Sequence, residues 1–118
     1  MKVFVYGSLK KNKRLHNYMK KAEFAGCAST FRRYPLVLSE KGWYPYLLNK
    51  PGRGFHIKGE VYDVNYSLLK RLDRLEEVPY YYIRKKITVI LNGKKIKADT
   101  YFYAKKKNFL KKDLLDEF

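Results

Sequence analysis

One Asn-Gly pair and the segments on either side of it constrain the fold of this chain more than any other feature. Residues 81–91 and 96–103 are rich in β-branched and aromatic side chains, and Asn92-Gly93 lies between them. Asn-Gly between two such runs is the strongest local signal for a β-hairpin. We therefore expect two long antiparallel strands joined by a tight turn in this part of the chain.

Several other segments have the composition of strands. They are residues 2–6, 24–38 with a bend at Tyr34-Pro35, 43–48, and 55–62, in which apolar and polar side chains alternate.

Helices are expected to be few and short. Apolar side chains at helical spacing predict one amphipathic helix over about 14–22 and a second over about 66–77, which Asn65 or Ser67 can cap. The basic segment 105–118 carries further apolar residues and is expected to be a docked C-terminal helix or tail. Because strands dominate, we expect a single α+β domain over residues 1–118, built around a curled or closed sheet.

Composition excludes several classes of protein. No apolar run approaches the roughly 20 residues of a membrane-spanning helix, and residues 1–9 lack a signal-peptide pattern. Cys27 is the only cysteine, and His16 and His56 lack the spacing of metal ligands. We therefore expect a soluble, cytoplasmic protein with no metal site. The absence of glutamine and the abundance of lysine are typical of thermophile proteins.

The chain is strongly basic, with 27 Lys and Arg against 11 Asp and Glu and a formal net charge of +16. Lys and Arg attract phosphates, and tyrosine rings, of which there are 12, can stack on bases. The basic residues are nevertheless spread over most of the chain, and no nucleic-acid-binding motif is present. A nucleic-acid-binding module is therefore kept as an alternative, and nucleic acid is not the expected partner.

The helix expected over 66–77 directs one carboxylate toward the core and its neighbour toward solvent. Glu76 lies about 50° from the centre of the leucine face of this helix, and Glu77 lies about 150° from it. Burial and the carbonyl end of the helix both disfavour a negative charge on Glu76, so we expect a raised pKa there. Such a carboxyl group is suited to general-base catalysis near neutral pH, although glutamates at the edge of a core are also common structural residues.

A Gly-Ser pair ends the first expected strand. Gly7 permits a ligand to approach the backbone closely, and successive free N–H groups around Ser8 can hold an anion such as a carboxylate. The same pair often only turns the chain, so this pattern alone leaves both interpretations open.

These segments together resemble the gamma-glutamylcyclotransferase-like superfamily. Residues 3–10 are similar to its N-terminal strand, which ends in Tyr-Gly-Ser/Thr-Leu, and residues 72–76 are similar to its Leu-Asp-x-x-Glu motif. Tyr82-x-Arg84 is similar to the Tyr-x-Arg at the start of the following strand. Residues 34–37, 47–52 and 59–62 are similar to the gamma-glutamylaminecyclotransferase branch. The resemblance covers residues 3–104 and lapses in the tail.

The resemblance implies a small mixed β-barrel flanked by a few short helices, and an enzyme without a metal, a cofactor or a covalent intermediate. The implied substrate is a small γ-glutamyl amine or amino acid, whose α-amino group attacks its own γ-carbonyl to give 5-oxoproline and a free amine. Glu76 would act as the base and then as the acid. The implied substrate-binding residues are Tyr6, Gly7, Ser8, Leu9 and Tyr82, with Arg84 nearby. A family member that binds γ-glutamyl ligands without turnover stays a further alternative.

Overall fold

The computed structural model describes all 118 residues of the chain. Its strands are β1 (Lys2–Val5), β2 (Glu23–Tyr34), β3 (Leu36–Leu38), β4 (Pro45–Leu47), β5 (Phe55–Asp63), β6 (Tyr82–Leu91) and β7 (Lys94–Tyr103). Its helices are one α-helix, α1 (Tyr66–Leu75), and two short 3-10 helices, η1 (His16–Met19) and η2 (Lys111–Asp113).

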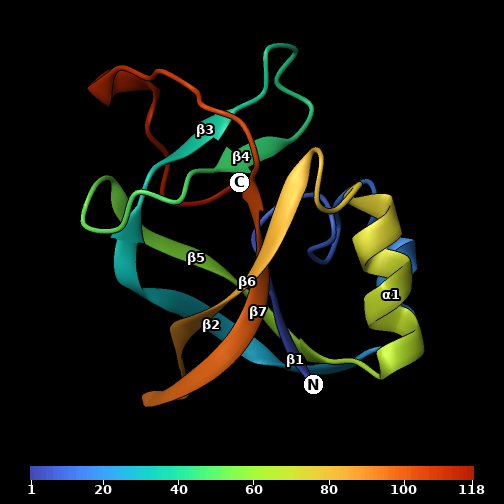
Figure 1. Cartoon of the computed structure of the whole chain (residues 1–118). Helices are drawn as coiled ribbons and strands as arrows, with labels where there is room; N and C mark the ends of the chain where they lie inside the picture. Colours follow the sequence, from blue (N-terminus) through green and yellow to red (C-terminus); the bar gives the residue numbers. More distant parts are fainter.

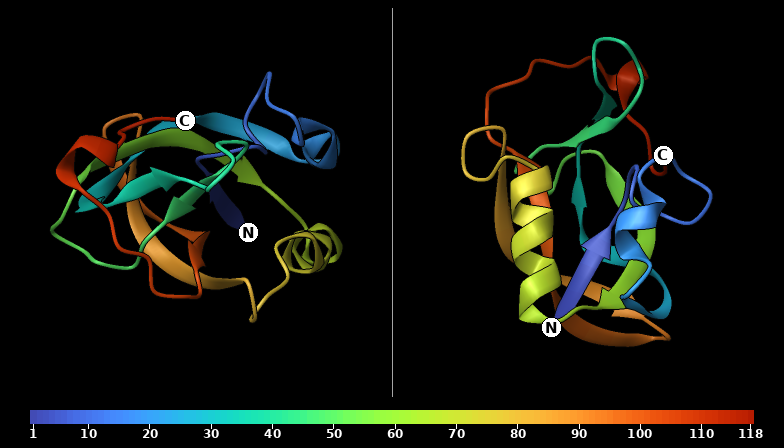
Figure 2. Two further views of the ribbon diagram at one scale, coloured as in Figure 1. Left: turned by 90° about the horizontal axis from the view of Figure 1, so that it is seen from above. Right: turned by 90° about the vertical axis from the view of Figure 1, so that its right-hand side faces the viewer.

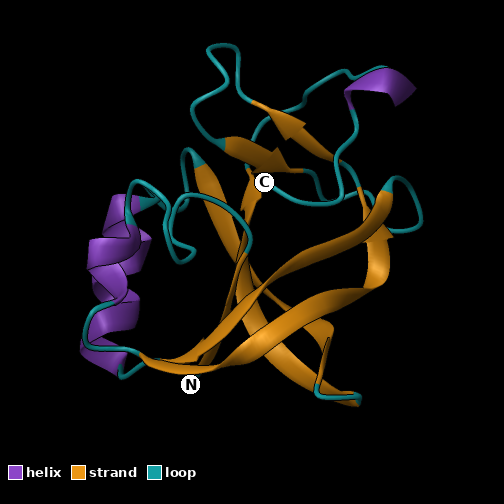
Figure 3. Ribbon diagram, turned by 180° about the vertical axis from the view of Figure 1, so that it is seen from behind, coloured by secondary structure: helices purple, strands orange, loops and turns teal.

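The strands form a closed barrel in the order β1-β5-β2-β6-β7 (Figure 1). Neighbouring strands are antiparallel except at the closure, where β1 pairs with β7 in parallel through Val3 and Asp99. The strands β3 and β4 form a separate two-stranded hairpin beyond one end of the barrel (Figure 3). The expected α+β class, a small mixed barrel flanked by short helices, is therefore confirmed.

The hairpin expected around Asn92-Gly93 is confirmed as β6 and β7. The two strands pair without interruption from Tyr82 opposite Tyr103 to Leu91 opposite Lys94. Asn92 and Gly93 have φ angles of 51° and 76°. Positive φ at both central residues is what the two-residue hairpin turn requires.

The helix α1 connects β5 to β6 and lies alongside the barrel (Figure 2). Of the two expected caps, Asn65 is the one used, since its side chain accepts a hydrogen bond of 2.8 Å from the Leu68 N–H. The helix buries Leu68, Leu69 and Leu72 against the barrel.

The helix ends at Leu75, two residues before the expected end at residue 77. Glu77 has a φ angle of 52°, and its N–H donates to the Arg74 carbonyl at 3.1 Å. The N–H of Val78 donates to the Asp73 carbonyl at 3.0 Å. These two bonds form a Schellman motif, in which the left-handed residue stops the helix. Glu76 therefore lies immediately after the last helical residue.

The helix expected over 14–22 is present only as η1. An isolated helix of this length is marginal in water, and no acidic side chain offsets the basic ones here. The N–H of Leu15 instead donates to the Ser8 carbonyl at 2.8 Å, and Met19 is buried in the core. Contacts with the rest of the chain thus determine the conformation of this segment.

The C-terminal segment docks as expected but forms no α-helix beyond the single turn of η2. Its backbone bonds to the barrel and hairpin: the Leu115 N–H donates to the Leu36 carbonyl at 2.9 Å, and the Lys58 N–H donates to the Asp116 carbonyl at 2.8 Å. Phe109 packs against a different part of the core from Leu115. The apolar side chains of the tail therefore pack against two separate core clusters. Side chains on one face of a helix would all point toward the same cluster.

Two clusters of buried side chains make up the core. One lies inside the barrel and includes Phe4, Ile57, Val61, Val89 and Phe102. The other lies between the barrel, α1 and the segment around η1, and includes Val3, Val5, Met19, Leu69 and Leu72. None of the helices is long and apolar enough to cross a membrane.

Gly59 marks the point of closest approach between β5 and β1. A Cβ atom at this position would lie 2.4 Å from the Val5 carbonyl oxygen and 2.6 Å from the ring of Phe4. Because the closed barrel leaves neither strand free to move away, we expect Gly59→Ala to lower the free energy of unfolding by about 3 kcal/mol. Urea unfolding measures this loss. Lys58→Ala, at the exposed neighbouring position, should change it by less than about 0.5 kcal/mol, and equal losses in both variants would contradict the steric explanation.

Candidate functional site

A cavity of about 310 Å³ opens between the end of β1, the end of α1 and the start of β6. It brings together the six residues predicted to catalyse the reaction or to bind substrate, namely Tyr6, Gly7, Ser8, Leu9, Glu76 and Tyr82. The other residues that line it are Phe4, Val5, Arg14, Leu15, Tyr44, Pro45, Leu75, Glu77, Tyr81 and Tyr101. Segments far apart in the sequence therefore meet at one cavity. The catalytic and substrate-binding roles of these residues stay predictions.

Glu76 is half-buried at the end of α1, and its carboxyl group lines the cavity without a hydrogen-bond or ion-pair partner in the protein. Burial raises its pKa from an ordinary value of 4.5 to about 7. Glu77 also lines the cavity, but its side chain is exposed. The structure thus separates the two adjacent carboxylates in the way the helical wheel predicted.

Three tyrosines stand close enough to Glu76 for its negative charge to raise their pKa values, in addition to the larger effect of burial on each. Their hydroxyl groups point elsewhere. Tyr6 donates to the Tyr101 carbonyl, Tyr82 donates to the Pro45 carbonyl at 3.1 Å, and Tyr101 donates to Asp73 Oδ1 at 2.8 Å. Since none of them donates to Glu76, its carboxyl group is free to exchange a proton with a bound molecule.

The loop after β1 offers backbone donors to the same cavity. Gly7, Ser8 and Leu9 are buried, yet none of their N–H groups has an acceptor in the protein. The Ser8 hydroxyl is likewise buried without a hydrogen-bond partner. Buried donors without partners are rare, because each costs free energy unless a ligand or water satisfies it. Consecutive free N–H groups form a recess suited to an anion or a carbonyl oxygen.

Gly7 allows this loop to lie against Pro45. A Cβ atom at residue 7 would come within 3.0 Å of both Cδ and Cγ of the proline ring. A larger residue at this position would push the loop away from Pro45 and shift the free N–H groups relative to Glu76.

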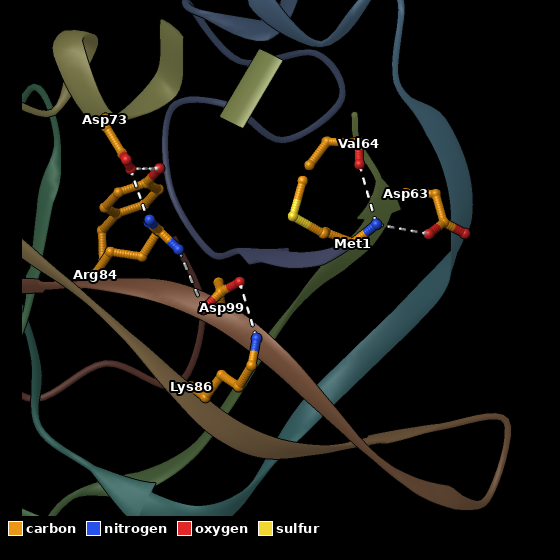
Figure 4. Close-up of polar contacts among 8 residues, drawn as sticks. Met1, Asp63, Val64, Asp73, Arg84, Lys86 and Asp99 are labelled. Carbon is orange, nitrogen blue, oxygen red and sulfur yellow. Dashed lines mark hydrogen bonds and ion pairs between the residues drawn. The ribbon is translucent and has the colours of Figure 1, made fainter. Parts of the chain in front are cut away.

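Arg84 does not line the cavity. Its Nε lies 2.9 Å from Asp73 Oδ1, and its Nη1 lies 3.6 Å from Asp99 Oδ1 (Figure 4). Lys86 also reaches Asp99, at 3.4 Å. Arg84 therefore joins the last turn of α1 to β6 and β7 and supports the position of Glu76 from outside the cavity.

Sequence reasoning missed Tyr44, Tyr81 and Arg14 as cavity residues. Tyr81 directly precedes the motif residue Tyr82, and the two rings stack with their centres 5.2 Å apart, so the run of tyrosines at 80–82 was the one available signal. Tyr44 comes from the segment before β4, and Arg14 from the basic segment before η1, and nothing in either pattern indicated a cavity. The structure has no group of three or more His, Cys, Asp or Glu side chains placed to hold a metal ion.

Comparison with known proteins identifies relatives that match most of this chain. A gamma-glutamylaminecyclotransferase A from Danio rerio is 39% identical over 108 residues, which are 86% of this chain and 67% of the zebrafish protein. A gamma-glutamylaminecyclotransferase from Bos taurus is 39% identical over 107 residues, which are 86% of this chain and 64% of the bovine protein. The chain thus spans about two thirds of the length of these relatives.

The fold has a close structural neighbour. The crystal structure of an AIG2-like protein from Mus musculus superimposes with a TM-score of 0.87 and 28% sequence identity, over 99% of this chain and 86% of the mouse chain. The model of the family described as "Gamma-glutamyl cyclotransferase, AIG2-like" matches residues 3–117. This match extends the resemblance through the tail, and the chain belongs to the gamma-glutamyl cyclotransferase, AIG2-like family.

Proposed function

We propose that this protein is a cofactor-independent gamma-glutamylcyclotransferase, which releases 5-oxoproline and a free amine from a γ-glutamyl amine. One observation carries the proposal. The unpartnered Glu76 carboxyl group, with its pKa raised by burial to about 7, shares a cavity with a loop of free backbone N–H groups. The names of the zebrafish and bovine relatives support the γ-glutamylamine type of substrate.

The reaction demands little covalent chemistry from the protein. The α-amino group and the γ-carbonyl belong to the same molecule, so ring closure depends on holding the substrate in a folded conformation. A cavity of about 310 Å³ is large enough for a bound γ-glutamyl group.

Glu76 moves the protons in this proposal. Its carboxylate takes a proton from the substrate α-ammonium, and the freed amine then attacks the γ-carbonyl carbon. The protonated Glu76 gives this proton to the leaving amine as the carbon–nitrogen bond breaks. The regenerated Glu76 carboxylate then takes the second proton from the ring nitrogen and passes it to the released amine, so that the products are neutral at the lactam nitrogen and protonated at the amine. A pKa of about 7 suits both steps, because a group with an intermediate pKa is an effective base and an effective acid at neutral pH.

The loop after β1 stabilises the charge that develops on oxygen. The N–H groups of Gly7, Ser8 and Leu9 lie in the cavity wall without acceptors, and they would donate to the γ-carbonyl oxygen or to the substrate's carboxylate. Donors already in place need no reorganisation during the reaction.

Replacement of Glu76 tests this assignment directly. Glu76→Gln keeps the size of the side chain but removes its ability to accept a proton, so we expect 5-oxoproline release to fall by at least about 100-fold. A panel of γ-glutamyl amines assayed for 5-oxoproline measures the loss. Glu77→Gln should retain most of the activity because Glu77 is exposed, and equal losses in both variants would contradict the assignment to Glu76 alone.

The pH dependence gives a second test. Because the carboxylate form of Glu76 is the base, kcat/KM should rise with pH and level off above a pKa of about 7. A rate profile from pH 5 to pH 9 measures this. A profile that is already close to level at pH 5.5 and above would show that the group responsible is not a buried carboxyl.

The buried Glu76 carboxyl group should also lower the free energy of unfolding at neutral pH. Its pKa is higher in the folded protein than in the unfolded chain, so the wild type loses stability relative to Glu76→Gln as pH rises from about 4.5 through 7. We expect the variant to become more stable than the wild type by up to about 3 kcal/mol at pH 8. Urea unfolding of both proteins at pH 4 and pH 8 measures the change, and a constant difference would contradict the burial of Glu76.

A further inference from the structure

The loop after β1 combines free N–H groups with occupied carbonyl oxygens. The Gly7 carbonyl accepts from the Lys10 N–H at 3.0 Å, which closes a tight turn around Ser8 and Leu9. The Ser8 carbonyl accepts from the Leu15 N–H at 2.8 Å. Because the C=O and the N–H of a trans peptide group point in opposite directions, the partners of these carbonyls determine where the free N–H groups point.

One side chain takes part in this arrangement. His16 is the first residue of η1, and its Nδ1 lies 2.9 Å from the Leu9 carbonyl oxygen. No other side chain bonds to a backbone atom of residues 7–10. A carbonyl oxygen can only accept, so Nδ1 must carry the hydrogen of the neutral ring and donate it. The same peptide group provides the Lys10 N–H that closes the turn onto Gly7, and His16 therefore holds the turn from outside.

The ring of His16 is itself fixed against β5. It is half-buried, and its centre lies 6.1 Å from the centre of the buried Tyr62 ring. Tyr62 donates to Glu60 Oε1 at 3.0 Å, and the same oxygen accepts from the Lys11 N–H at 3.0 Å. The barrel thus anchors both His16 and the chain that follows the turn.

His16 does not line the cavity. Its contact reaches the reaction only through the turn, whose Gly7, Ser8 and Leu9 do line the cavity. Without the bond from Nδ1, the Leu9 carbonyl would have no partner in the protein, and the peptide group after Leu9 would be free to rotate. The N–H groups of Ser8 and Leu9 would then lose their fixed direction.

We propose that His16 is a positioning residue, whose Nδ1–H keeps the N–H groups of Ser8 and Leu9 directed into the cavity by holding the Leu9 carbonyl. The inference rests on the proposed function, in which these N–H groups donate to the substrate. Donors stabilise a developing charge effectively only when they are already in place, so a bond that fixes their direction contributes to the rate without touching the substrate.

The ring nitrogens of His16 provide a test that needs no substrate. NMR of the neutral ring distinguishes a hydrogen on Nδ1 from a hydrogen on Nε2, and the hydrogen bond to Leu9 requires it on Nδ1. We therefore expect the Nδ1–H form in the wild type. A ring with its hydrogen on Nε2 would turn a lone pair toward the Leu9 carbonyl and would overturn the proposal.

Two uncharged variants of similar size separate the hydrogen bond from packing. His16→Asn keeps an N–H donor near the position of Nδ1, whereas His16→Leu has no donor. We expect kcat/KM for 5-oxoproline release to fall about tenfold in His16→Leu and to stay within about threefold of the wild type in His16→Asn. The dissociation constant of 5-oxoproline, measured by calorimetry, should rise about tenfold in His16→Leu alone, because its carboxylate and carbonyl oxygen are acceptors for the same donors.

His56 provides the matched control. Its Nδ1 lies 3.1 Å from the Thr30 carbonyl oxygen, so it makes the same kind of contact outside the cavity. His56→Leu should keep kcat/KM and the dissociation constant within about twofold of the wild type. The amide resonances of Ser8 and Leu9 should shift in His16→Leu and keep their positions in His56→Leu.

The outcomes separate this inference from the proposed function. Wild-type kcat/KM in His16→Leu, or equal losses in His16→Asn and His16→Leu, would show that the hydrogen bond does not position the loop. If His16→Leu does not fold, the hydrogen position on the wild-type ring and the activity of His16→Asn decide the question. The absence of 5-oxoproline from every γ-glutamyl amine tested with the wild type would overturn the proposed function. The ring nitrogens and the amide resonances of Ser8 and Leu9 would then still decide the role of His16 in the loop.

Discussion

The contact between Asp73 and Arg84 holds the last turn of α1 against the barrel, and the position of Glu76 depends on it. Arg84 Nε lies 2.9 Å from Asp73 Oδ1, and Tyr101 donates to the same oxygen at 2.8 Å. Asp73 is mostly buried, so removing either partner would leave an uncompensated polar group. Because Asp73 is one helical turn from Glu76, this anchor and the Schellman motif at Glu77 together determine where the Glu76 carboxyl group enters the cavity.

Opposing electrostatic effects act on that carboxyl group. Burial favours its protonated form and raises its pKa to about 7. The net charge of +16 acts in the opposite direction, since a positive field favours an ionised carboxylate and attracts anionic molecules. Burial dominates because it acts at the group itself, whereas most of the basic side chains are exposed and screened by salt. The charge that first suggested nucleic acid therefore has a smaller role at this site than one desolvated glutamate.

Local patterns predicted the parts of the fold that depend on local interactions. The turn at Asn92-Gly93 and the leucine face of α1 with its Asn65 cap are examples, because hydrogen bonds and burial within a few residues decide them. The amphipathic helix expected over 14–22 is wrong, because only the 3-10 helix η1 forms there, and of the two alternatives for residues 105–118 the structure shows a docked tail. Leu15 bonds to Ser8 in the preceding loop, and Leu115 bonds to Leu36 in β3. A periodicity of apolar residues carries no information about such partners.

The sequence by itself indicated which carboxylate lies nearer the core, since a helical repeat places Glu76 on the side of the leucines. The helix ends at Leu75, so the Schellman motif and the Asp73–Arg84 contact fix the final position of Glu76. The sequence also indicated the loop at residues 7–9 and, by resemblance, the family. Only the tertiary structure decided that Arg84 lies outside the cavity and that Tyr44 and Tyr81 lie inside it. The physical reason is that barrel closure and the packing of α1 bring together segments that are far apart in the chain. The hydrogen bonds that join Tyr81 to Tyr44 and Tyr46 likewise exist only once those segments are in contact.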